Sequence, residues 1–209
     1  MSQLIPITTT RLGEHLPLLE LLPDANPLAW VRSADGLVGW GSYASTVVKG
    51  ANRFADARTW WYQQLEKFAI ADSVHASGTG PILFTSFSFD PDEDSVLVIP
   101  QIVVGMRNGS SWITWIGEQP QPKLLEEVPL LEDAEFNWGD GSLSPAEWQV
   151  RVAQAIKEIE DTQLEKVVLA RDLKINSHRP IDARKILRNL SVEYPSTWIF
   201  AVDGLVGAT

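Results

Sequence analysis

One lysine stands where its side chain could do acid–base chemistry. Lys166 lies in the segment Leu164–Leu173, which reads LEKVVLARDL, and the β-branched residues after it favour a short strand with Lys166, Val168 and Ala170 on one face. A lysine in water titrates near ~10.4, so only about one in 2,500 is a neutral base at pH 7. An apolar wall or a neighbouring positive charge would lower that pKa and make the amine a general base. The alternative is structural, because a lysine at a strand end or edge also discourages unwanted strand pairing.

Two other motifs fit a functional template only in part. The stretch Gly39–Ala44, GWGSYA, matches G-x-G-x-x-A, but the following STVVK favours a strand where a dinucleotide site needs a helix. We therefore expect glycines of a twisted hairpin. Asp90, Asp92 and Asp94 stand at positions 1, 3 and 5 of a calcium loop, but the glycine and glutamate required at positions 6 and 12 are replaced. A solvated acidic loop is the better interpretation.

The composition narrows the class of protein. The 209 residues suggest one domain, or one domain and part of another, and 17 basic against 27 acidic side chains give a net charge of −10. No cluster of Lys and Arg is present, so neither a nucleic acid nor an anionic membrane is an expected partner. The absence of cysteine removes disulfides, thiolate nucleophiles and Cys-bound zinc. With no signal-peptide pattern and no long apolar run, we expect a soluble, cytoplasmic domain.

The first half of the chain alternates between strand and helix patterns. Residues 28–49 predict two strands around a turn, 54–70 an amphipathic helix and 82–89 a further strand. Residues 96–107 and 111–117 predict two strands, and the Asn-Gly pair between them is a strong hairpin signal.

The second half has the best-marked helix of the chain. Residues 118–143 are acidic, contain proline and lack periodicity, which predicts a long surface connection. Ser144, Pro145 and Glu147 then form the start of a helix over about 145–161. A second helix over about 181–192 and a hairpin that turns at Asp203-Gly204 follow. This order predicts an α+β fold, a largely antiparallel sheet with packed helices.

Two stretches carry a family resemblance. Residues 81–91, PILFTSFSFDP, and residues 144–209, with EKVVLAR and GLVGAT as their most specific parts, resemble the chorismate-utilising enzymes and, within them, the isochorismate synthases. The resemblance implies the chorismate-binding enzyme fold, with residues 1–209 as the N-terminal portion of a single domain and 118–143 as a connection within it.

The resemblance also implies a reaction. In the family, water adds at C2 of chorismate while the C4 hydroxyl leaves, with Mg²⁺, and Lys166 matches the lysine that activates the water. Anthranilate synthases usually carry glutamine at this position, so the lysine favours water as the nucleophile. Salicylate synthases also keep the lysine and remain an alternative, as does a non-catalytic relative of the family.

The sequence departs from the family pattern at several points. Thr85-Ser86 replaces a pair of glycines, and Asp161 stands where a glycine is common. In the family a Pro-Glu pair, which carries the general acid, comes directly after the position of Thr209, and the Mg²⁺ ligands lie further on. We therefore expect no metal site within these 209 residues, an inactive fragment that self-associates, and a monomeric full-length protein.

Overall fold

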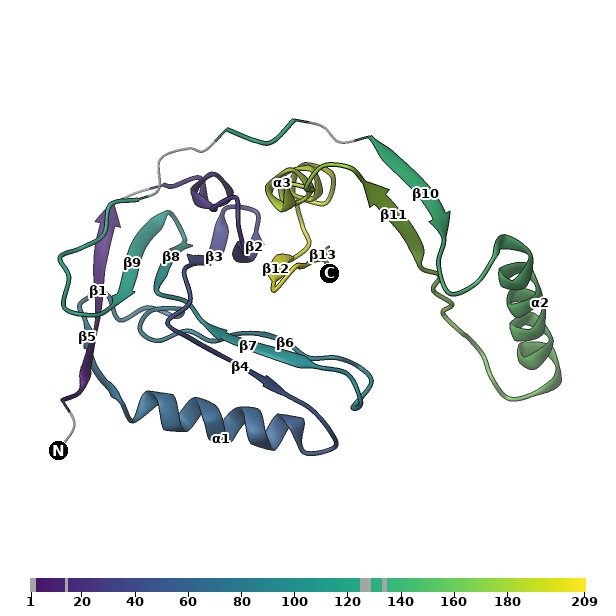
Figure 1. The fold of residues 1–209 in the computed structure, drawn as a ribbon, viewed down its shortest axis with the longest axis horizontal. Coiled ribbons are helices and arrows are strands. Elements are labelled where there is room, and N and C mark those ends of the chain that lie inside the picture. Colours follow the sequence, from purple (N-terminus) through teal and green to yellow (C-terminus); the bar gives the residue numbers. More distant parts are fainter. Residues whose placement is uncertain (1–2, 14, 125–128, 133–134) are drawn as a thin grey trace. The chain divides into compact units, whose positions relative to one another are not determined.

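The computed structural model describes residues 3–13, 15–124, 129–132 and 135–209 (Figure 1). The chain divides into two compact units, which are described separately. Unit 1 contains Met1–Leu130 and Asp182–Thr209, and unit 2 contains Leu131–Ile181. No helix in the described part of the chain is long and apolar enough to cross a membrane.

The main element of unit 1 is an eight-stranded sheet in the order β13-β12-β2-β3-β8-β9-β1-β5. Its strands are β1 (Ile5–Gly13), β2 (Leu28–Arg32), β3 (Asp35–Trp40), β5 (Phe68–Asp72), β8 (Ile102–Arg107), β9 (Ser110–Ile116), β12 (Ile199–Val202) and β13 (Leu205–Ala208). Every neighbouring pair is antiparallel except β1 and β5, which are parallel. The predicted α+β fold with a largely antiparallel sheet is thus confirmed.

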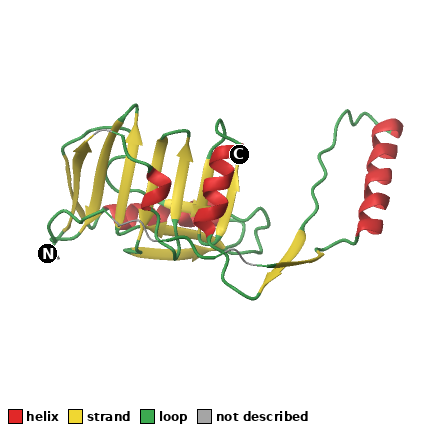
Figure 2. Ribbon diagram, turned by 90° about the horizontal axis from the view of Figure 1, so that it is seen from above, coloured by secondary structure: helices red, strands yellow, loops and turns green. Residues whose placement is uncertain are grey.

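A 3₁₀ helix and an α-helix cover one face of this sheet. They are η1 (Leu18–Leu21) and α3 (Ala183–Glu193), and Figure 2 shows both lying against the strands. Alternate residues of β2, β3, β8, β9 and β12 point toward them, as a half-buried strand requires. The buried core includes Leu18, Leu21, Ala29, Val31, Val38, Val104, Met106, Ile113, Leu187, Ile199 and Ala201.

A smaller sheet and one helix complete unit 1. The strands β4 (Ala44–Val48), β7 (Ser95–Ile99) and β6 (Phe84–Ser86) form an antiparallel sheet in that order. Helix α1 (Arg53–Leu65) follows β4. Two smaller buried clusters, one around Ile7, Phe68, Ile99 and Ile116 and one around Leu28, Phe84 and Val202, lie away from η1 and α3.

Unit 2 has regular elements but no core. Helix α2 (Pro145–Asp161) is flanked in the chain by β10 (Phe136–Asp140) and β11 (Leu173–Ser177), which pair as an antiparallel ribbon. None of its described residues is buried. β10 lies inside the stretch 118–143, which the sequence predicted as an irregular connection, and residues 125–128 and 133–134 of that stretch are outside the described chain.

Residues 28–49 hold three strands where two were predicted, and the strand predicted over 82–89 is reduced to Phe84–Ser86. Two further predicted elements have different boundaries for a clear physical reason. The helix predicted to reach residue 70 ends at Leu65, because Phe68 begins strand β5 and pairs with Ile5. The strand predicted over 96–107 is two strands in different sheets, β7 and β8. They separate at Pro100, which has no N–H to donate to a sheet ladder.

Local signals predicted three other elements correctly. Ser144 caps α2 by accepting a hydrogen bond from the Glu147 N–H at 3.3 Å, and the Ser144 N–H donates to the Glu147 carboxylate at 2.8 Å. Asn108 and Gly109 both have positive φ, as the predicted tight hairpin requires. The second predicted hairpin turns at Asp203-Gly204, between β12 and β13.

Candidate functional site

Lys166 lies in an extended segment that is not a strand. Residues 164–172 form no helix or strand, and every side chain from 161 to 170 is exposed, with Val168 at 80%. The prediction of a strand over VVLA was therefore wrong. A strand has no internal hydrogen bonds and exists only where a neighbour pairs with it, and within the described residues this segment has none.

Both ends of the Lys166 segment are anchored within unit 2. At its start, the Thr162 hydroxyl donates to the Glu158 carbonyl at 2.6 Å and accepts from the Leu164 N–H at 3.1 Å. At its end, the Asp172 carboxylate accepts from the N–H and hydroxyl of Ser142 at 2.8 and 2.6 Å. These two bonds lower the pKa of Asp172 below its ordinary value. The segment is therefore a tethered loop rather than a free tail.

The Lys166 amine faces solvent in this unit. Within the described chain it makes no hydrogen bond and no ion pair. The nearest apolar side chains in sequence, Val167, Val168 and Leu164, are 40%, 80% and 43% exposed. Unit 2 by itself therefore does not supply the apolar wall that the general-base hypothesis requires.

The GLVGAT motif forms the edge of the large sheet in unit 1. Asp203 and Gly204 turn the chain with φ angles of 49° and 81°, and among the described strands β13 then pairs with β12 alone. At Gly207 a Cβ would come within 2.6 Å of the Phe200 ring, so a larger residue there would make that ring shift. Trp198 and Thr209 close the hairpin with two backbone hydrogen bonds of 2.8 Å.

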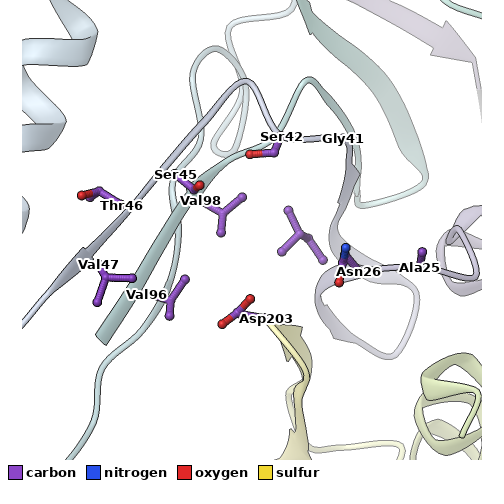
Figure 3. Close-up of a pocket in the computed structure, with 11 residues that line it drawn as sticks. Ala25, Asn26, Gly41, Ser42, Ser45, Thr46, Val47, Val96, Val98 and Asp203 are labelled. Carbon is purple, nitrogen blue, oxygen red and sulfur yellow. The ribbon is translucent and has the colours of Figure 1, made fainter. Parts of the chain in front are cut away.

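A cavity of about 580 Å³ opens beside this hairpin, between its turn and the small sheet (Figure 3). Asp203, Asn26 and Ser45 project toward it from three different segments. The complete lining is Ala25, Asn26, Leu28, Gly41, Ser42, Ser45, Thr46, Val47, Val96, Val98 and Asp203. Its size suits a small molecule, and its walls offer hydroxyl, amide and carboxylate groups but no cationic side chain.

The other sequence motifs keep structural roles. Gly39 lies within β3, and Gly41 has a φ of 70°. The residues after Gly41 form strand β4, as expected, so no helix follows the G-x-G-x-x-A pattern directly. In the acidic loop the Asp92 N–H donates to the Asp90 carboxylate at 2.8 Å. Among the described residues no three His, Cys, Asp or Glu side chains lie together as metal ligands.

Sequence reasoning marked Lys166 and the GLVGAT hairpin but missed the cavity and the loop anchors. Asn26 and Asp203 are far apart in the chain and come together only through the pairing of β12 with β2. Ser142 and Asp172 meet through the pairing of β10 with β11. The one local signal near the cavity was Asp203-Gly204, which predicted the hairpin turn but not that Asp203 lines a cavity.

Comparison with known proteins places the chain among its relatives. Residues 26–209 match the family model described as chorismate binding enzyme. Isochorismate synthase MenF of Bacillus subtilis (strain 168) is 25% identical over 199 residues, which cover 80% of this chain and 42% of that protein. A Mycobacterium tuberculosis (strain H37Rv) protein, named as a candidate isochorismate synthase MenF, is 30% identical over 135 residues, covering 64% of this chain and 32% of that one.

A solved structure shows the same fold. The structure of MenF, the menaquinone-specific isochorismate synthase from Escherichia coli, matches 98% of this chain with a TM-score of 0.65 at 16% identity, and the match covers 50% of that chain. The chain thus spans between 32% and 50% of the length of these relatives.

Proposed function

The chain belongs to the chorismate binding enzyme family, and on that premise we propose that the whole protein is an isochorismate synthase. The observation that carries the proposal is Lys166 in EKVVLAR, followed in the same chain by GLVGAT. A lysine at this position favours water as the nucleophile, whereas the ammonia-using relatives usually carry glutamine there.

Lys166 acts in this proposal as the general base. Its neutral amine removes a proton from water while the water oxygen bonds to C2 of the ring, and the C4–O bond breaks as the hydroxyl leaves. The leaving hydroxyl takes a proton from an acid, so that substrate and product have the same composition. We place that acid in the part of the family pattern that follows GLVGAT.

The family implies Mg²⁺, and the described residues do not fit it. They bring no three potential ligands together, and the cavity beside GLVGAT has Asp203 as its one carboxylate. We therefore propose that the ligands of the metal, like the contacts to the substrate carboxylates, lie outside these residues.

The 209 residues alone are expected to be inactive. Lys166 is exposed, and an exposed amine lacks the desolvation that turns a lysine into a base. In the active protein, the apolar side chains around Lys166 must be covered by further protein, which also excludes bulk water from the reacting atoms.

A product assay tests the activity. Incubating the complete protein with chorismate and Mg²⁺ and separating the products by chromatography should give isochorismate. Salicylate with pyruvate as the main products would establish the salicylate synthase alternative, which Lys166 also permits. Recovery of unchanged chorismate would support a non-catalytic relative.

A matched pair of lysine variants tests the role of Lys166. Lys166→Ala should lower kcat by about 10²- to 10⁴-fold, the range of general-base catalysis, with little change in substrate binding. Lys174→Ala, at an exposed position on β11 in the same unit, should keep normal turnover. Near-normal turnover of Lys166→Ala would remove the general-base assignment.

A further inference from the structure

A second pocket of unit 1 has three tryptophans in its lining. It has a volume of about 250 Å³ and is lined by Trp30, Leu37, Gly78, Arg107, Trp112 and Trp198, among others. Trp30 pairs with Leu37, Leu37 with Gly105, and Gly105 with Trp112 across four neighbouring strands. These residues therefore share one face of the large sheet, opposite to the face that η1 and α3 cover.

One wall of the pocket is an exposed aromatic stack. The ring centroids of Trp30 and Trp198 lie 5.5 Å apart with 23° between the ring planes, and Phe200 also stacks with Trp30, at a centroid distance of 5.8 Å. Trp30 keeps 42% of its surface exposed. A partly exposed indole that lines a pocket offers a surface on which another flat ring can pack, edge to face or offset.

The opposite wall is held in place by a fixed loop. The indole N–H of Trp112 donates to the Gly78 carbonyl at 3.2 Å, and the Trp112 ring covers Gly105 so closely that a Cβ there would collide with it. The loop that carries Gly78 is organised by Asp72, whose carboxylate accepts from the Thr79 hydroxyl at 2.5 Å and the Val74 N–H at 2.8 Å. The pocket is therefore preformed, and binding would need little rearrangement.

Two guanidinium groups give the pocket its charge. The Cζ atom of Arg32 lies 5.0 Å from the centroid of the Trp198 ring, and Arg107 lines the pocket and is exposed. Neither makes an ion pair within the described chain. The acid opposite Arg32 in the strand register is Asp35, and it accepts a hydrogen bond from the Asn108 N–H at 2.9 Å. Arg32 and Arg107 carry two positive charges and Asp35 carries one negative charge, so these three side chains have a net charge of +1 that can attract an anionic ligand.

We propose that this pocket binds a planar aromatic monocarboxylate. The ring packs against the exposed part of the Trp30 indole, and the carboxylate accepts hydrogen bonds from Arg107, with Arg32 adding charge. A guanidinium group matches the two oxygens of a carboxylate in a planar, bidentate arrangement. The site is separate in its residues from the cavity beside GLVGAT, and its existence does not depend on the proposed reaction.

Benzoate is the probe that tests the proposal, used with the complete protein. Calorimetric titration should give saturable binding of benzoate, while acetate, which has no ring, and benzyl alcohol, which has no charge, should bind at least tenfold more weakly. Tryptophan fluorescence should change on the same concentration scale, because Trp30 and Trp198 contact the ring. Absence of saturable benzoate binding would overturn the proposal, as would equal affinity for acetate or for benzyl alcohol.

Variants assign the binding to this pocket. Arg107→Gln should weaken benzoate binding at least tenfold and leave the circular dichroism spectrum unchanged, since Arg107 is exposed. Arg58→Gln, at an exposed position on α1, should bind as the unchanged protein does. Trp30→Phe should retain more of the affinity than Trp30→Ala, because phenylalanine keeps a ring face. Unaltered benzoate affinity of Arg107→Gln would place the binding elsewhere and refute the assignment.

Discussion

Helices α2 and α3 both begin at a side-chain cap, yet one belongs to a packed core and the other does not. Asp182 caps α3 by accepting from the Arg184 N–H, and Leu187 in the same helix is completely buried. Ser144 caps α2 with a full capping box, but none of the residues of α2 is buried. A cap therefore determines where a helix begins, whereas burial against other elements supplies most of its stability.

The same contrast holds for ion pairs. In unit 1, Arg184 and Asp182 have side chains that are 2% and 1% exposed, and Arg184 also donates to the Pro129 carbonyl at 3.1 Å. Hydrogen bonding to Asp182 raises the pKa of Arg184. In unit 2, Arg171 and Asp140 are 23% and 55% exposed at a distance of 3.3 Å. Only the first pair is removed from water.

The largest expected difference in stability is between variants that break the buried pair and variants that break the exposed one. Arg184→Met should lower the free energy of unfolding by about 3–5 kcal/mol, because it leaves the Asp182 carboxylate buried without its cation. Arg171→Met should cost about 0–1 kcal/mol, as is usual for exposed pairs. Urea unfolding of the complete protein measures both. Equal losses for the two variants would contradict the distinction between the units.

The next effect concerns the apolar faces of the two helices. Leu187→Ala should lower the free energy of unfolding by about 2–5 kcal/mol, because it leaves a cavity in the core. Ile156→Ala in α2, where Ile156 is 52% exposed, should change it by about 0.5 kcal/mol or less. A loss of several kcal/mol for Ile156→Ala would mean that the apolar face of α2 is covered in the complete protein.

Local signals in the sequence predicted what depends on neighbouring residues and failed where distant segments meet. Ser144 and Glu147 predicted the start of α2, and Asn108-Gly109 predicted a hairpin. The parallel pairing of Phe68 with Ile5 ended α1 earlier than its periodicity indicated. The Lys166 segment pairs with no strand among the described residues, so the strand predicted there does not form. The lining of both pockets depends on strand order, which no local pattern encodes.

The smallest effect is the pH dependence at two aspartates. Burial alone would raise the pKa of Asp72, but hydrogen bonds from Thr79, Val74 and His75 outweigh it and hold that pKa below the ordinary value of 3.8. A carboxylate with a lowered pKa stabilises the folded state fully above the unfolded pKa, and this stabilisation is lost as the pH falls through the folded pKa. The unfolding free energy should therefore decrease as the pH falls below about 4, and Asp72→Asn should reduce that decrease.

Asp172 offers the comparison in unit 2. Its pKa is also lowered, by the hydrogen bonds from Ser142, so ¹³C titration of the carboxyl groups should place both aspartates below 3.8. Asp172→Asn should loosen the local anchor of the Lys166 segment, seen as faster amide exchange at Ser142, with little change in global unfolding. A larger global loss for Asp172→Asn than for Asp72→Asn would contradict the ranking of the two units.

The exposed run Val167–Leu169 has a consequence for colloidal behaviour. Its apolar side chains are bracketed by charges, Glu165 and Lys166 before them and Arg171 and Asp172 after them. Charges in such positions act as gatekeepers, because they oppose the stacking of short β-prone segments from different chains into aggregates. In the 209-residue chain, Lys166→Ala removes one gatekeeper and Lys166→Arg retains it, so the arginine variant of this chain should stay in solution at concentrations at which the alanine variant precipitates.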